Sequence, residues 1–335
     1  MDHQMAISYR MGELELWNPF SKRRMGVLNR NWDSVTIEHV EPVSPSVLAI
    51  INAGVRHKQR MTDGGKVYFT KVDWSAGYNR FPKMPIKVWD QEPQPGMGIS
   101  AIEGIASAAS SDGNRVLLYT GDKSLGYVYR RIFDISGAEA VKINEQRLIN
   151  KHSGSVTSLC YVEGGGYVVS GNTAGKLYIN DHASAMCTQT IDVGTGVKIR
   201  SITRSPFNPH LFMVGCNYPN NDLLIFDNRH RVNRGTPSLT LKDNNRVITL
   251  QYIRPVWDAE TGLFYSPARG FDNTSISVWD PRFVRCGDPD KFVIDSSVDK
   301  VHSVGFTAPM ARKGRVMITA SMYGTGFMPI TDDIL

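Results

Sequence analysis

The chain has 335 residues, of which 41% are hydrophobic and 21% charged, an ordinary globular composition with enough length for a large core. The formal net charge of +6 is a mild basic excess, which is compatible with nucleic acid or an acidic protein as partner and proves neither. No apolar run approaches the roughly 18 residues that a membrane helix needs, so we expect no membrane partner.

The four cysteines favour a reducing compartment. Cys160, Cys187, Cys216 and Cys286 lie far apart and form no Cys-x-x-Cys pair, so the sequence predicts neither a zinc site nor a disulfide framework. The first residues lack the basic-then-apolar layout of a secretory signal. We therefore expect reduced thiols in a cytoplasmic or nuclear protein.

The first 150 residues predict short strands separated by turns. The segments 56–65 and 75–85 break this pattern and indicate extended loops. Trp89-Asp90 closes a strand over 86–90 that we expect to be the outer fourth strand of its unit. In chain order, the expected strands cover residues 6–9, 13–18, 35–40, 47–51, 66–73, 86–90, 99–102, 115–121 and 126–134.

The clearest repeating unit starts at His152-Ser153-Gly154. Its first turn, from Glu163 to Gly166, contains glycines that can take positive φ without steric cost. A second turn follows at residues 172–175. The strands expected around these turns cover residues 156–161, 167–171, 176–181 and 187–191.

The same order of strands and turns recurs downstream of residue 195. The expected strands cover residues 199–203, 211–215, 223–227, 247–252, 263–265, 276–280, 301–306, 316–320 and 326–330. No window of about 12 residues places apolar side chains at i, i+3, i+4 and i+7, so we expect almost no helix.

A Trp-Asp pair, or a weaker version of it, ends several third strands. Trp279-Asp280 is the best preserved, and Asn180-Asp181 and Phe226-Asp227 are related pairs. The spacing from Val156 to Ile199 falls within the roughly 40–45 residues of a WD repeat, and the chain resembles the WD-repeat family. The resemblance implies an all-β fold, a propeller of about seven divergent blades whose ring is closed by strands from both termini.

We expect residues 1–335 to form a single β-propeller domain. Five complete units lie between two partial ones, and insertions in the loops account for the longer units. The expected blades are residues 1–30 (partial), 31–95, 96–150, 151–194, 195–243, 244–296 and 297–335 (partial).

In the WD-repeat family a His, a strand Ser or Thr, a turn Asp and the Trp lock each blade through hydrogen bonds. The resemblance assigns this structural role to His152 and Ser170 in one unit, and to Asp272 and Trp279 in another. No unit carries the full set. We therefore expect the blades to be held mainly by apolar packing between sheets.

An arginine follows two of the Trp-Asp-like pairs. Trp279-Asp280-Pro281-Arg282 and Phe226-Asp227-Asn228-Arg229 are similar to the WDxR element of substrate receptors for cullin–RING ubiquitin ligases, whose arginine contacts the cullin adaptor. Arg is suited to bidentate pairing with a carboxylate at an interface. The same element also occurs in WD proteins that are not receptors. The implied adaptor-binding residues are Trp279, Asp280, Arg282, Phe226, Asp227 and Arg229.

Basic side chains gather in several expected loops and offer an alternative function. On a shared face they would attract a phosphate backbone or an acidic peptide, which predicts a nucleic-acid or chromatin-binding propeller. Each cluster alone is also typical of a solvated loop. The residues of this basic surface are Lys22, Arg23, Arg24, Arg56, Lys58, Arg60, Arg231, Arg234, Arg312 and Lys313.

The sequence carries no motif for catalysis. It lacks a P-loop, a Gly-x-Ser-x-Gly elbow, a His-Glu-x-x-His pair and a dinucleotide-binding glycine motif, so we expect no enzyme, no cofactor and no metal. The favoured function is a non-catalytic scaffold for protein–protein interaction within a multi-subunit complex. Neither the identity of the partner nor the face that binds it follows from these patterns.

Overall fold

The computed structural model is all-β in the residues that it describes, apart from one 3-10 turn, η1 (Glu163–Gly165). No helix in this part of the chain is long and apolar enough to cross a membrane. The structure describes residues 5–8, 14–18, 21, 23–28, 37–44, 47–52, 56–57, 60–61, 66–71, 103–111, 114–122, 126–137, 140–148, 151–217, 223–229, 236–241, 255–267, 275–280, 291–295, 301–306, 315–321 and 325–330.

Short strands follow one another along the whole chain. The first are β1 (Met5–Ser8), β2 (Leu14–Asn18), β3 (Arg23–Leu28), β4 (Ile37–Ser44), β5 (Val47–Asn52), β6 (Arg56–His57), β7 (Arg60–Met61), β8 (Lys66–Lys71), β9 (Glu103–Ser111), β10 (Arg115–Asp122), β11 (Val128–Asp134) and β12 (Val141–Arg147). Then come β13 (Val156–Val162), β14 (Tyr167–Asn172), β15 (Lys176–Asp181), β16 (Cys187–Asp192), β17 (Lys198–Arg204), β18 (Leu211–Asn217), β19 (Leu223–Asp227) and β20 (Leu239–Leu241). The last are β21 (Val256–Trp257), β22 (Phe264–Pro267), β23 (Ser275–Trp279), β24 (Lys291–Asp295), β25 (Val301–Phe306), β26 (Arg315–Ser321) and β27 (Thr325–Ile330).

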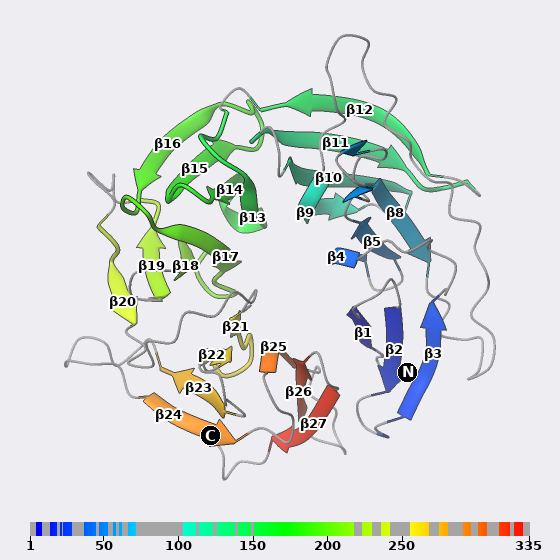
Figure 1. Ribbon diagram of the computed structural model, residues 1–335, viewed down its shortest axis with the longest axis vertical. Coiled ribbons are helices and arrows are strands. Elements are labelled where there is room, and N and C mark those ends of the chain that lie inside the picture. Colours follow the sequence, from blue (N-terminus) through cyan, green and yellow to red (C-terminus); the bar gives the residue numbers. More distant parts are fainter. Residues whose placement is uncertain are drawn as a thin grey trace.

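The strands pair into small antiparallel sheets. Within the described residues there are seven sheets of three or four strands and one separate hairpin, β6–β7. Figure 1 shows the seven sheets following one another in chain order around a central space, with the first strand of each sheet innermost. The sheets are β1–β3, β4–β5–β8, β9–β12, β13–β16, β17–β20, β21–β24 and β25–β27.

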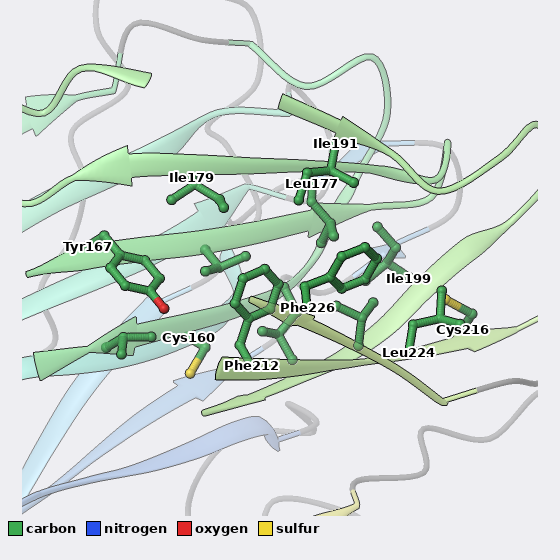
Figure 2. Packing of buried hydrophobic residues seen from close by; sticks show 14 of the residues in the cluster. Cys160, Tyr167, Leu177, Ile179, Ile191, Ile199, Phe212, Cys216, Leu224 and Phe226 are labelled. Atoms are coloured by element: carbon green, nitrogen blue, oxygen red, sulfur yellow. The ribbon is translucent and has the colours of Figure 1, made fainter. Parts of the chain in front are cut away.

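The innermost strands pack against the sheets on both sides. All seven residues of β13 are buried. Because successive side chains of a strand point to opposite faces, Cys160 packs with the following sheet, while Leu159 and Tyr161 pack with the preceding one. Figure 2 shows the first of these clusters, in which the rings of Phe212 and Phe226 stack with their centroids 5.6 Å apart. Burial between sheets is therefore the main stabilising interaction.

Two threonine hydroxyls add polar ties between neighbouring sheets. Thr157 Oγ1 donates to the carbonyl oxygen of Ile199 at 2.5 Å, and Thr203 Oγ1 donates to that of Pro255 at 3.1 Å. Both donors lie on innermost strands, Thr157 buried and Thr203 partly buried, where an unpaired hydroxyl would cost free energy. These bonds therefore fix the sheets relative to each other as well as satisfying the hydroxyls.

The all-β architecture and most inner strands agree with the sequence-based expectation, but several outer strands do not follow from it. The sequence does not predict β3, β12, β20 or β24. Two of them show why: β12 is largely exposed, and β20 has only three residues, so neither carries a clear alternation of buried and exposed positions.

Several expectations need correction or lie outside the described residues. The loop expected over 56–65 contains the β6–β7 hairpin, in which Arg56 pairs with Met61. β9 begins at Glu103, just after the strand expected at 99–102. The segments 75–85, 86–90, 99–102 and 247–252 lie outside the described residues. The described strands of residues 1–30 form their own sheet, β1–β3, and none of them pairs with β25–β27.

Candidate interaction surface

The end of each sheet at which its first and second strands are joined is called the lower end here. In the sheets from β9 to β24, the third strand also finishes at this end, with an aspartate as its last residue or directly after it. These aspartates are Asp134, Asp181, Asp227 and Asp280, and each follows a buried side chain, namely Phe133, Asn180, Phe226 or Trp279. The lower end therefore repeats one local arrangement from sheet to sheet.

Two of these aspartates cap the turn that follows them. Asp134 Oδ1 accepts hydrogen bonds from the backbone N–H and hydroxyl of Ser136 at 2.9 and 2.6 Å. Asp181 Oδ2 accepts the same pair from Ser184 at 2.7 and 2.6 Å. These hydrogen bonds favour the carboxylate and lower the pKa of both groups. Each carboxylate is thus used inside its own turn.

Asp227 instead holds an arginine. Its carboxylate accepts the backbone N–H of Arg229 at 3.0 Å and binds the guanidinium in a bidentate manner, with Nη2 at 2.6 Å and Nε at 3.0 Å. The hydrogen bond and the charge of Asp227 raise the pKa of Arg229. Asp227 is buried, whereas 56% of the Arg229 side chain is exposed. The guanidinium is therefore fixed in position and still accessible.

A neighbouring turn at the same end exposes an aromatic ring. Phe207 is 58% exposed although it is a large hydrophobic residue. Its backbone N–H donates to Ser205 Oγ at 3.3 Å, which shapes the turn. The ring lies over the next sheet, where a Cβ added to Gly262 would come within 3.5 Å of Cε2. Phe207 is thus presented by an ordered turn.

Two hydrogen bonds join the turn of Phe207 to that of Arg229. The backbone N–H of Asn228 donates to the carbonyl oxygen of His210 at 2.9 Å, and Asn228 Oδ1 lies 3.0 Å from His210 Nδ1. One sheet therefore carries both exposed groups on linked turns. Met186, in the corresponding turn of the preceding sheet, is 51% exposed. We call Met186, Phe207 and Arg229 the lower-end surface.

The residues expected to bind an adaptor have different surroundings. Phe226 and Trp279 belong to hydrophobic clusters between sheets, and Asp280 is also buried. Arg282 lies outside the described residues. Of the expected set, Arg229 is the one described residue that is more than half exposed.

Two of the four residues expected to lock blades, His152 and Ser170, contact each other. His152 Nε2 lies 2.8 Å from Ser170 Oγ, and the imidazole packs edge-on against Tyr178 with the ring centroids 4.3 Å apart. Burial lowers the pKa of His152 to about 4, so the ring is neutral. The turn between β14 and β15 is held by Asn172, whose Oδ1 accepts the backbone N–H groups of residues 174 and 176. Asp272 lies outside the described residues.

The expected basic surface lies almost wholly beyond what the structure describes. Among its ten residues, Arg24 is exposed and lies on β3. Arg23, Arg56 and Arg60 lie on strands whose side chains are not described, and Lys22, Lys58, Arg231, Arg234, Arg312 and Lys313 lie outside the described residues.

Two polar clusters have no signal in the sequence. Arg131 is only 1% exposed, and it donates from Nε to Glu145 Oε2 at 2.8 Å and from Nη1 to Thr120 Oγ1 at 2.7 Å. The Tyr119 hydroxyl is hydrogen-bonded to His182 Nδ1 at 2.9 Å, and burial raises the pKa of Tyr119 to about 12. Because the partners come from different strands and turns, only the fold brings them together.

Neither cluster has the make-up of a metal site. Within the described ranges, no three His, Cys, Asp or Glu side chains are grouped so that they could hold a metal ion.

Comparison with known proteins supports the fold. No protein-family model matches the chain, and neither does any curated protein. Among solved structures, the chain is similar to one in the crystal structure of a mitotic checkpoint complex, with a TM-score of 0.67 and 17% sequence identity over 98% of this chain and 84% of that chain. At this identity the similarity shows the fold alone, which is all-β and propeller-like.

Proposed function

We propose that the protein is a non-catalytic scaffold that binds another protein through its lower end. The observation that carries the proposal is the Arg229 guanidinium, held by buried Asp227 and still 56% exposed beside the turn of Phe207. Arg and aromatic side chains supply much of the energy of protein interfaces. A group already held in its binding geometry loses little conformational entropy on association.

Ring geometry gives this surface its rigidity. In the proposed arrangement the seven sheets are the blades of one propeller domain, and strands from both termini close the ring. The chain-order arrangement of the sheets around a central space and the similarity to the checkpoint-complex chain support this arrangement. A closed ring packs the faces of every sheet against two neighbours, so turns at the lower end are carried on a fixed frame.

Affinity capture from cell extract tests the scaffold function. Wild type is compared with a Phe207→Ser, Arg229→Ala double variant and with Thr190→Ala, which changes an exposed residue of β16. We expect at least one protein to fall by about tenfold or more with the double variant and to be retained by the control. An identical set of captured proteins for all three would contradict the proposal. Capture that disappears after nuclease treatment would support a nucleic-acid partner instead.

A more specific form of the proposal is a substrate receptor of a cullin–RING ubiquitin ligase. The support is the resemblance of Asp227-Asn228-Arg229 to the WDxR element and the exposure of Arg229 at the lower end. Arg282 follows the corresponding strand of the next sheet in the sequence. In this role both arginines would contact the cullin adaptor.

The receptor role predicts a defined loss of adaptor binding. An Arg229→Ala, Arg282→Ala variant should recover about tenfold less cullin adaptor in a pull-down, because it loses two charge-assisted contacts. Arg115→Ala with Arg204→Ala is the matched control, since both arginines are exposed, lie at the lower end and carry the same charge. Equal recovery by both variants would rule out the receptor role and leave the general scaffold function in place.

A further inference from the structure

Strand β12 differs from the other outer strands in its exposed hydrophobic residues. It is the fourth strand of its sheet and pairs with β11 on one side. Within the described residues, no strand pairs with its other side. Val141 and Ile143 are 57% and 50% exposed. An edge strand with exposed aliphatic side chains is a template for pairing with another strand.

The other outer strands provide an internal comparison. β16 presents Thr188, Thr190 and Asp192 to solvent, and its Ile191 is buried. β20 has only three residues and buries Leu241. Neither has an exposed large hydrophobic side chain. With seven residues, β12 is also longer than both. The exposed aliphatic residues are therefore specific to β12 among the outer strands whose side chains are described.

β12 is held firmly from its inner side. Glu145 accepts hydrogen bonds from Arg131 Nε at 2.8 Å and from Lys142 Nζ at 2.9 Å. Near the end of the strand, the guanidinium of Arg147 lies 4.5 Å from the ring centroid of Tyr127. Since Lys142, Glu145 and Arg147 already have partners within the chain, β12 can accept a new strand with little loss of conformational entropy.

The charge around β12 is positive. β11, β12 and the residue Lys151 carry five cationic side chains and two carboxylates, and both carboxylates have hydrogen-bond partners within the chain. Lys151 Nζ lies 5.2 Å from the ring centroid of Tyr127, close to Arg147 on the same ring. An acidic strand would be attracted to this edge, and a basic one repelled.

We propose that β12 binds an extended segment of a partner protein, which pairs with it as a fifth strand and alternates apolar with acidic side chains. The backbone of the segment hydrogen-bonds to the edge of β12 that faces away from β11, its apolar side chains cover Val141 and Ile143, and its carboxylates approach Lys142, Arg147 and Lys151. This assignment rests on the proposed scaffold function and adds to it a second surface with a defined ligand chemistry.

A synthetic probe tests the assignment directly. The probe is a fluorescently labelled, capped peptide of about nine alternating valine and glutamate residues, the length of a long strand. Fluorescence anisotropy should show binding to the full chain with a Kd on the order of 10–100 µM. A Val141→Thr, Ile143→Thr variant should bind about tenfold more weakly, because it keeps β-propensity and loses the aliphatic contacts. Met186→Thr is the control, since it removes an equally exposed apolar side chain elsewhere, and it should bind as wild type does.

Two further probes separate strand pairing from general attraction. A peptide with alternate amides N-methylated cannot complete the backbone ladder, and a valine–lysine peptide has the opposite charge, so neither should bind.

Three results would overturn the proposal: no binding of the valine–glutamate peptide, equal binding by the double variant, or equal binding of the N-methylated peptide. Self-association in sedimentation that the double variant abolishes would also overturn it, because a second copy would then occupy the edge. The effect of the Phe207→Ser, Arg229→Ala variant on protein capture is measured in a separate experiment. A failure of the scaffold function can therefore be distinguished from a failure of this assignment.

Discussion

Arg131 shows how a single residue can depend on its neighbours for stability. A guanidinium that is 1% exposed has lost almost all contact with water, and desolvation of a charge is costly. Glu145 and Thr120 replace the lost hydration with direct hydrogen bonds. The Arg131–Glu145 pair therefore carries no net charge, and its burial costs only a moderate amount of stability. Removing Glu145 would leave Arg131 as a buried cation with too few hydrogen-bond acceptors.

The first prediction concerns this ion pair. Glu145→Gln should lower the free energy of unfolding by about 1–3 kcal/mol at pH 7, less than for a fully buried pair because Glu145 is partly exposed. Burial raises the pKa of Glu145, but Arg131 and Lys142 outweigh this effect and lower it below the usual value. The stabilisation is therefore present above the unfolded-state pKa and is lost as pH falls through the folded-state pKa.

Denaturant unfolding at a series of pH values measures this difference. Wild type and Glu145→Gln should converge at acidic pH. Lys142→Gln is the control, because this more exposed contact to the same carboxylate should contribute less than about 1 kcal/mol. A difference that persists unchanged at low pH would mean that the ion pair is not its origin.

The second prediction concerns His152. Burial lowers its pKa to about 4, so the unfolded chain binds a proton at higher pH than the folded chain does. The stabilisation is present above the unfolded-state pKa of about 6.5 and is lost as pH falls toward 4, by up to about 3 kcal/mol. His152→Gln should show a shallower decline in unfolding free energy between pH 7 and 4. Parallel curves for the two proteins would contradict the assignment of His152 as a buried neutral group.

At the scale of elements, most strands are predictable, but several outer ones are not. β13, β14 and β15 follow from alternation and from glycine-containing turns, because they pack between sheets and are bounded by tight connections. β12 faces solvent and carries charged side chains, so its sequence resembles a loop. Its strand structure depends on pairing with β11, which is a long-range property.

The third prediction compares two glycines with positive φ. Gly166 has φ of 62° and an added Cβ would meet nothing within 4 Å, whereas a Cβ on Gly175, with φ of 79°, would collide with the carbonyl oxygen of Gly194 and lie 2.9 Å from that of Val197. Gly166→Ala should cost about 1 kcal/mol, from backbone strain alone. Gly175→Ala should cost at least about 2–3 kcal/mol, because backbone atoms must also move. Equal thermal stabilities would show that the turn at Gly175 adapts freely.

At the scale of the whole molecule, the candidate site was only partly predictable. The position of Arg229 after Phe226-Asp227 marks it in the sequence, because the third strand must end at the lower end of its sheet. The contribution of Phe207 is not visible there, since a Phe in a Ser-Pro-Phe-Asn-Pro turn is equally suited to the core. Its exposure follows from how the turn packs on the next sheet, which only the assembly of neighbouring sheets determines.

The central claim, that partner binding uses the lower end, is tested most directly by hydrogen–deuterium exchange of the protein alone and in the complex recovered by affinity capture. We predict slower exchange on binding in the turns at residues 205–210 and 228–229, where Phe207 and Arg229 lie. Unchanged exchange in both turns, with protection confined to the opposite end of the sheets, would contradict the claim.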